Sequence, residues 1–113
     1  MKILLLLTSF VIVSNVFATI SIPRGEMEKK AAEEVATHTG FTESDSRYPS
    51  ALTDCANNQA SGGYKYFVKL NEYFTSEEFT SQSPELKEAD IFEARIAIKM
   101  LCSEFIEAAG IEI

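Results

Sequence analysis

Two cysteines, Cys55 and Cys102, carry the clearest chemistry in this sequence. An even number of cysteines in an exported chain is typical of a disulfide, because thiols are oxidised outside the cytosol. The bond would close a loop across 47 positions. On the chain-entropy account such a crosslink stabilises a small domain by roughly 4 kcal/mol. We therefore predict one internal disulfide, Cys55–Cys102, rather than two free thiols or an intermolecular bond.

His38 is the only histidine and the only candidate for a catalytic base or a nitrogen ligand. A zinc site needs three or four ligands, and Glu34, one helical turn earlier, is the one companion in reach. A Ser-His or Cys-His nucleophilic set would also depend on His38, and the chain has no Gly-x-Ser-x-Gly motif. We expect no metal site, and we expect His38 to be solvated near the end of a helix.

Paired carboxylates and adjacent glycines give no stronger indication of catalysis. A glycosidase needs two carboxylates across a cleft, whereas neighbouring acids on a helix usually point into solvent. Ser61-Gly62-Gly63 lacks the Lys-Ser/Thr that completes a phosphate-binding loop. The sequence therefore predicts neither an enzyme nor a cofactor.

An aromatic cluster follows the two glycines, between residues 64 and 79. Part of it belongs in the core, because a chain without Trp builds its interior from Phe, Ile and Leu. On a helix, however, Tyr64 and Tyr66 cannot both face in the direction of Phe67. Exposed tyrosines beside lysines are typical of protein-binding surfaces. The candidate partner-binding residues are Tyr64, Lys65, Tyr66 and Tyr73.

The first 18 residues, MKILLLLTSFVIVSNVFA, have the pattern of a signal peptide. Lys2 precedes an apolar run that is shorter than the roughly 20 residues of a spanning helix. Small or β-branched residues then lead to Ala18, where we expect cleavage. The prediction is an exported chain, periplasmic or secreted, with residues 19–113 as a single mature helical domain and no stable membrane insertion after cleavage.

The charge balance restricts the class of partner. Loss of Lys2 with the signal peptide takes the formal net charge from −7 to −8. Such a surface repels phosphate backbones, so no nucleic acid is expected as a partner. The expected partner is another protein, and the sequence is also compatible with a dimer.

Two segments have clear helical patterns, and a third, from Leu52 to Phe74, has a mixed pattern. Residues 25–40 form a helix that stops at Gly40, and its thin apolar face (Met27, Ala31, Val35) predicts the weakest packing of the set. Residues 41–50 form a loop that ends in a helix cap at Ser50. Ser83-Pro84-Glu85 begins a long helix that closes at Gly110. Its wide apolar stripe, which includes Phe92, Ile96 and Met100, predicts the central helix of a bundle.

The segment from Leu52 to Phe74 has two interpretations. Apolar residues advance by three or four positions, which indicates one helix through Gly62-Gly63. Alternation after Tyr64 is also compatible with a strand, but no second strand is evident as a partner. The helix is favoured, with a bend at the glycines allowed.

Together these features predict an all-α fold, a small antiparallel helical bundle of three to four helices stapled by one disulfide. Two helices joined through residues 75–83 would run antiparallel, with 55 beside 102 and 70 opposite about 87. The expected function is that of an exported small helical binding protein, an inhibitor or immunity-type protein that blocks a partner. The alternatives are an acid-stress or holdase chaperone of the periplasm and a small hydrophobic-ligand carrier.

Overall fold

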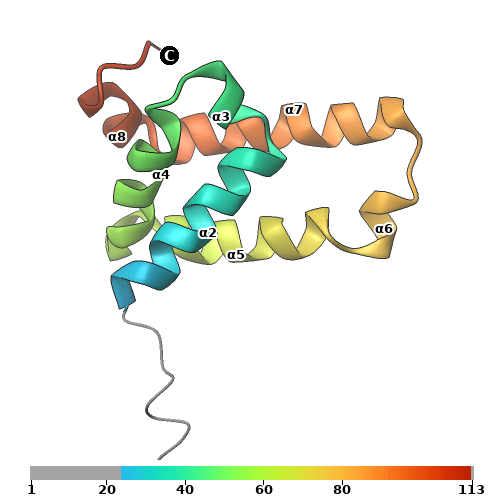
Figure 1. The fold of residues 1–113 in the computed structure, drawn as a ribbon, viewed down its shortest axis with the longest axis horizontal. Coiled ribbons are helices and arrows are strands. Elements are labelled where there is room, and N and C mark those ends of the chain that lie inside the picture. Colours follow the sequence, from blue (N-terminus) through green and yellow to red (C-terminus); the bar gives the residue numbers. More distant parts are fainter. Residues whose placement is uncertain (1–23, 113) are drawn as a thin grey trace, which may run out of the picture.

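The computed structural model describes residues 24–112, which are all-helical with no strand, as predicted. The predicted signal peptide, residues 1–18, lies outside the described residues, together with residues 19–23 and 113. Figure 1 gives the arrangement. The elements are α2 (Arg24–His38), α3 (Phe41–Ser44), α4 (Tyr48–Asn57), a 3₁₀ turn (Gln59–Ser61), α5 (Gly63–Phe74), α6 (Glu77–Thr80), α7 (Pro84–Leu101) and α8 (Ser103–Ala108).

Helix α2 lies across α4 and α5 and packs more extensively than predicted (Figure 1). Ala31, Ala32, Val35 and Ala36 are all buried in the main core. The prediction that this helix packs weakly was wrong, because it rested on the small size of the side chains on its apolar face. Small residues allow the backbone of a neighbouring helix to approach closely, so a narrow stripe of alanines can lie at the centre of a core.

The segment predicted as a loop, residues 41–50, is mostly helical. It contains α3 and the start of α4, which begins at Tyr48, with Pro49 in its first turn, rather than at a Ser50 cap. Phe41 is fully buried and stacks on Tyr48 with ring centres 4.3 Å apart. The Arg95 guanidinium lies 4.4 Å from the centre of the Phe41 ring. These contacts hold the connection between α2 and α4, residues 39–48, against α7. We call this connection the corner.

A second contact fixes the end of α2 to the same helix. Arg95 Nη1 donates a hydrogen bond of 2.7 Å to the backbone carbonyl of Thr39, a residue that is 1% exposed. Arg47 forms a similar link at the other side of the corner. It pairs with Asp45 at 2.8 Å, the one ion pair recorded within residues 24–112, and reaches the Gly110 carbonyl at 3.3 Å. The hydrogen bond from Arg47 lowers the pKa of Asp45 to about 2.

The helix predicted to run through Gly62-Gly63 is interrupted. Helix α4 ends at Asn57, a 3₁₀ turn follows, and α5 starts at Gly63. Gly62 has φ of 75°, a left-handed conformation that glycine adopts without steric cost. The helical interpretation of residues 64–74 is confirmed, and the continuous helix is corrected to two helices joined by a turn.

Helix α7 begins as predicted but does not occupy the centre of the fold. The Ser83 hydroxyl caps it by accepting the Leu86 N–H at 3.3 Å, with Pro84 in the first turn. Its buried residues are Ala94 and Ile98 only. Phe92, Ile96 and Met100, which were predicted to widen its inner apolar stripe, point outwards, and the helix stops at Leu101 before the short helix α8 rather than continuing to Gly110. The exposed set is Leu86, Phe92, Ile96 and Met100.

Helices α5 and α7 form an antiparallel hairpin through α6, which reaches away from α2 and α4 (Figure 1). The Tyr73 hydroxyl donates to the Asp90 carboxylate, so position 73, rather than 67, lies opposite 90. The predicted register was wrong because the turn before α5 separates the disulfide from the hairpin. A small second cluster, Phe74, Phe79 and Ala94, packs this distal part apart from the main core.

Candidate functional site

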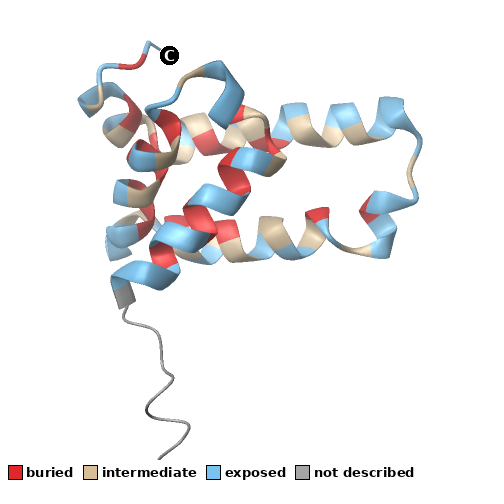
Figure 2. Cartoon of the chain, viewed as in Figure 1, coloured by how far each residue is buried: buried red, intermediate tan, exposed pale blue. Residues whose placement is uncertain are grey.

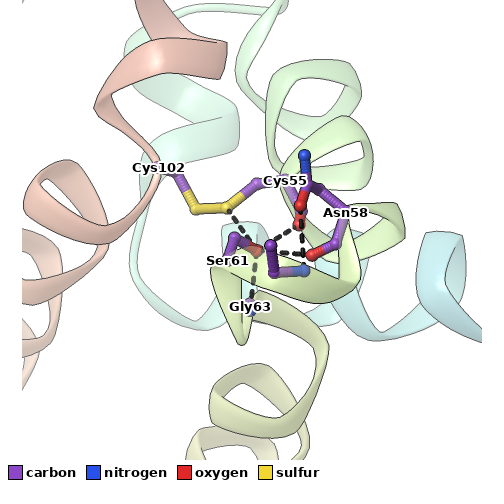
Figure 3. The surroundings of a disulfide bond; sticks show 6 residues. Cys55, Asn58, Ser61, Gly63 and Cys102 are labelled. Atoms are coloured by element: carbon purple, nitrogen blue, oxygen red, sulfur yellow. Dashed lines mark hydrogen bonds between the residues drawn. A yellow bond between two sulfur atoms is a disulfide. The ribbon is translucent and has the colours of Figure 1, made fainter.

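The disulfide and the turn beside it form the rigid part of the site (Figure 3). Cys55 and Cys102 are bonded as predicted, with Cα atoms 5.6 Å apart, and both residues are fully buried. The Ser61 hydroxyl donates to the carbonyl oxygens of Cys55 at 2.7 Å and Asn58 at 2.8 Å. It accepts the Gly63 N–H at 3.0 Å. One serine thus ties the end of α4 to the start of α5.

Helices α4 and α5 approach each other closely at Gly63. A Cβ atom at this position would lie 3.1 Å from both the carbonyl oxygen and the Sγ atom of Cys55. The backbone of α4 is thus packed closely against the start of α5. The approach sets the direction in which α5 leaves the turn.

Gly63→Ala is expected to lower the free energy of unfolding by about 1–3 kcal/mol, because the added methyl group overpacks a backbone contact that cannot relax easily. Chemical denaturation followed by circular dichroism measures this loss. Gly25→Ala is the matched control, since nothing lies within 4 Å of its Cβ position. The control should be neutral or slightly stabilising. Equal effects of the two variants would contradict the close packing at Gly63.

A ridge on α5 follows directly from this turn. Tyr64, Val68 and Glu72 are spaced by four residues, so they share one face of α5. Tyr64 and Val68 are half-buried against the main core, and Glu72 is exposed. We call these three residues the Tyr64 ridge.

Two open recesses border the Tyr64 ridge and share its three residues. The first, of about 400 Å³, lies between α5 and α2. The second, of about 550 Å³, lies between α5, the end of α4 and the 58–62 turn. The first adds Met27, Lys30, Ala31, Glu34, Asn71 and Thr75, and the second adds Glu28, Ala56, Asn58, Gln59, Gly62, Gly63, Lys65 and Lys69.

The separation of α2 and α5 at the first recess is held by a direct hydrogen bond. Asn71 Nδ2 donates to the backbone carbonyl of Ala31 at 3.1 Å. Because one end of this bond is backbone and the other is a half-buried side chain, the floor of the recess is fixed. What the ridge and its recesses offer is an aromatic and aliphatic surface with charged side chains of both signs at its border.

The four predicted partner-binding residues divide between two sides of α5. Tyr64 and the exposed Lys65 lie at the ridge and its recesses. Tyr66 and Tyr73 are half-buried on the side that faces α7, where Asp90 also lies. Burial raises the pKa of Tyr66, and the hydrogen bond to Asp90, with a smaller contribution from desolvation, raises the pKa of Tyr73.

His38 packs its ring 5.5 Å from the ring of Phe74 at the end of α2. Within residues 24–112, no group of three or more His, Cys, Asp or Glu side chains is arranged to hold a metal ion. Over the same range no helix has the length and hydropathy to cross a bilayer.

Sequence reasoning missed the part of the site that α2 contributes. Met27 is 42% exposed and Ala31 is buried, and both line the first recess beside Tyr64. The signal was available in the apolar face of residues 27–35, which was read only as weak packing. Comparison of the chain with family models, curated proteins and solved structures found no match in any of the three.

Proposed function

We propose that this chain is an exported binding protein that blocks a partner protein, as an inhibitor or an immunity-type protein does. The observation that carries the proposal is the Tyr64 ridge with a recess on each side. A half-buried tyrosine between two hollows matches the anchors that dominate protein interfaces, where an aromatic residue contacts the partner over a wide, dry area.

The rigidity of the scaffold supports the same function. The ridge begins one residue after Gly63, whose N–H is bonded to Ser61, and that turn is packed on the disulfide. A preformed surface loses little conformational entropy on binding, so more of the contact energy remains as affinity.

The charged residues at the border of the site indicate which partner segment fits. Both recesses have charges of both signs at their border: Lys30, Glu34 and Glu72 at the first, and Glu28, Glu72, Lys65 and Lys69 at the second. A partner segment would place apolar side chains in the recesses, with acidic and basic groups around them to pair with these charges. Charge complementarity of this kind fixes orientation and speeds association more than it adds affinity.

Tyr64→Ala is expected to weaken partner binding by at least about 2 kcal/mol, roughly thirtyfold, since the change removes the central anchor. The protein is immobilised with its disulfide intact and exposed to the periplasmic or secreted fraction of the source cells. The captured partner is identified, purified and titrated calorimetrically with the wild type and the variant. Its own activity is then measured with and without the bound protein, because blocking requires a loss of that activity.

Tyr73→Phe is the matched control, because it changes a tyrosine on the α7 side of the same helix and keeps the ring. This variant should bind the partner as tightly as the wild type does. If Tyr73→Phe weakens binding and Tyr64→Ala does not, the α7 side of α5 is the binding surface and the proposed site is wrong. If the bound partner remains fully active, the blocking function is wrong.

A further inference from the structure

Most of the large hydrophobic side chains that the described fold leaves exposed lie on α7. We define the outer face as Leu86, Phe92, Ile96 and Met100, whose exposed fractions are 57%, 63%, 44% and 74%. Ala94 and Ile98, on the opposite side of the same helix, face the cores. The helix is therefore apolar on two opposite sides, and residues 24–112 cover only one of them. Figure 2 shows which parts of α7 are exposed and which are buried.

The size of the outer face suggests that it is a contact surface. Four large side chains with these exposures present roughly 400–500 Å² of surface, within the range of the largest apolar patch on a typical monomer. A standard protein interface takes about 800 Å² from each partner. With the polar residues that border it, the outer face reaches the size expected of a weak, micromolar association.

We propose that the outer face of α7 binds the same face of a second copy of this chain, with the two α7 helices antiparallel. The apolar residues are distributed nearly symmetrically about the middle of α7. Leu86 and Met100 lie seven residues before and after Glu93, and Phe92 and Ile96 lie two residues before and after Ala94. A twofold axis beside residues 93–94 therefore places Leu86 against Met100 and Phe92 against Ile96. Such self-complementarity is what a twofold interface requires.

The charges beside the outer face are centred between Glu93 and Ala94, the centres of the two apolar pairs. Glu88 and Lys99 are equally distant from the point between residues 93 and 94, and they are three helical turns apart on one flank. In an antiparallel pair with twofold symmetry, the same flank of each helix meets across the axis. Glu88 of one copy would thus meet Lys99 of the other, twice per dimer. Within residues 24–112 neither side chain has an ion-pair partner in its own chain.

The alternative occupants fit less well. Glu88 flanks the outer face, Glu85 and Glu93 lie between its apolar residues around the helix, and the whole chain carries a net charge of −7. An anionic membrane surface would be repelled by these carboxylates and supplies no cation to pair with Glu88. A second copy carries the same net charge, but it supplies Lys99 opposite Glu88 together with a matching apolar face.

Sedimentation equilibrium between about 1 and 200 μM tests the proposal. The wild type is expected to show a reversible monomer–dimer equilibrium in the micromolar range. Phe92→Asp should weaken dimerisation at least tenfold, because it puts two carboxylates at the centre of the apolar contact. Tyr64→Ala, which changes the proposed partner-binding ridge, should leave dimerisation unchanged, so this proposal and the proposed function can fail separately. A wild type that stays monomeric at 200 μM would overturn the dimer.

Charge reversal tests the antiparallel register. Glu88→Lys and Lys99→Glu should each weaken dimerisation about three- to tenfold, since each turns two attractive pairs into repulsive ones. The double variant E88K/K99E should recover the wild-type affinity, because both pairs are restored with their signs exchanged. Dimers that are indifferent to all three changes would show a different interface. Binding of the wild type to vesicles rich in phosphatidylglycerol, lost in Phe92→Asp, would assign the face to a membrane and overturn the proposal.

Spin labels give the orientation independently. Labels at Glu93→Cys should lie within about 15 Å across the axis, as expected for helices in contact. Labels at Glu85→Cys should be displaced by about 25 Å along the helices. Short distances at both positions would indicate a parallel pair and overturn the antiparallel arrangement.

Discussion

Replacing Cys55 and Cys102 together by alanine is expected to lower the free energy of unfolding by about 4 kcal/mol. The crosslink closes a loop across 47 positions, so its loss restores a large entropy to the unfolded chain. The whole free energy of unfolding of a small domain is only about 5–15 kcal/mol, so the variant should be partly unfolded at physiological temperature. Urea denaturation followed by circular dichroism, with and without the substitutions, measures the difference.

A reducing agent provides the control for this experiment. Dithiothreitol should destabilise the wild type by a similar amount and should leave the double variant unchanged. Two alanines also remove buried thiol contacts, and the reduced wild type separates that contribution from the crosslink itself. A double variant as stable as the oxidised wild type would contradict the assigned role of the bond.

Phe67→Ala is expected to lower the free energy of unfolding by about 3–5 kcal/mol, the usual range for truncating a fully buried aromatic residue. Phe67 is 0% exposed and lies in the main core, to which α2, α3, α4, α5, α7 and α8 contribute side chains. Removing its ring leaves a cavity beside side chains that are themselves fully enclosed. The loss is measured by thermal or chemical unfolding at about 1 μM protein, where self-association contributes little.

Phe92→Ala is the matched control, with the same atoms removed from a ring that is 63% exposed. It should change the free energy of unfolding by less than about 0.5 kcal/mol, as is usual for substitutions at the surface. The two variants distinguish the structure from the expectation of a central last helix, in which Phe92 would be buried. Similar losses in both variants would show that the outer side of α7 is packed within the monomer.

The helical class and the disulfide could be predicted from the sequence because their signals are local or pairwise. Helix starts such as Ser83-Pro84 depend on neighbouring residues alone. The cysteine pair depended only on an even count and an expected oxidising compartment. Both inferences were confirmed without knowledge of which helices touch.

The inferences that failed concern tertiary context. The apolar pattern gives the side of a helix that is apolar, but a helix such as α7 with two apolar sides does not indicate which one the core uses. In α2 the opposite error occurred, because alanines carry a weak apolar signal and still allow the closest helix contacts. The break in the helix at Gly62 is the one missed feature that neighbouring residues alone could have predicted. Asn58, Ser61 and two glycines in six residues form a recognisable turn signal, which was outweighed by the periodicity on either side.

The division of the site has a similar origin. Tyr64, Lys65, Tyr66 and Tyr73 were grouped because they are close in sequence and of suitable types. A helix turns by 100° for each residue, so Tyr64 and Tyr66 necessarily face different neighbours. Only the positions of α2 and α7 reveal that Tyr64 lies at the two recesses beside α2 and the 58–62 turn, whereas Tyr66 lies at a smaller recess between α5 and α7.

The separate cluster of Phe74, Phe79 and Ala94 has a consequence for how the molecule fluctuates. The disulfide and the main core hold one end of the α5–α6–α7 hairpin, whereas the far end depends on three buried residues and the Tyr73–Asp90 contact. Segments with few buried contacts open at lower free energy than the global unfolding reaction. Backbone amides around α6 should therefore exchange with solvent through local opening, while those near Cys55 exchange only when the whole chain unfolds. We therefore expect two cooperative units of unequal stability, joined in one chain that the disulfide crosslinks.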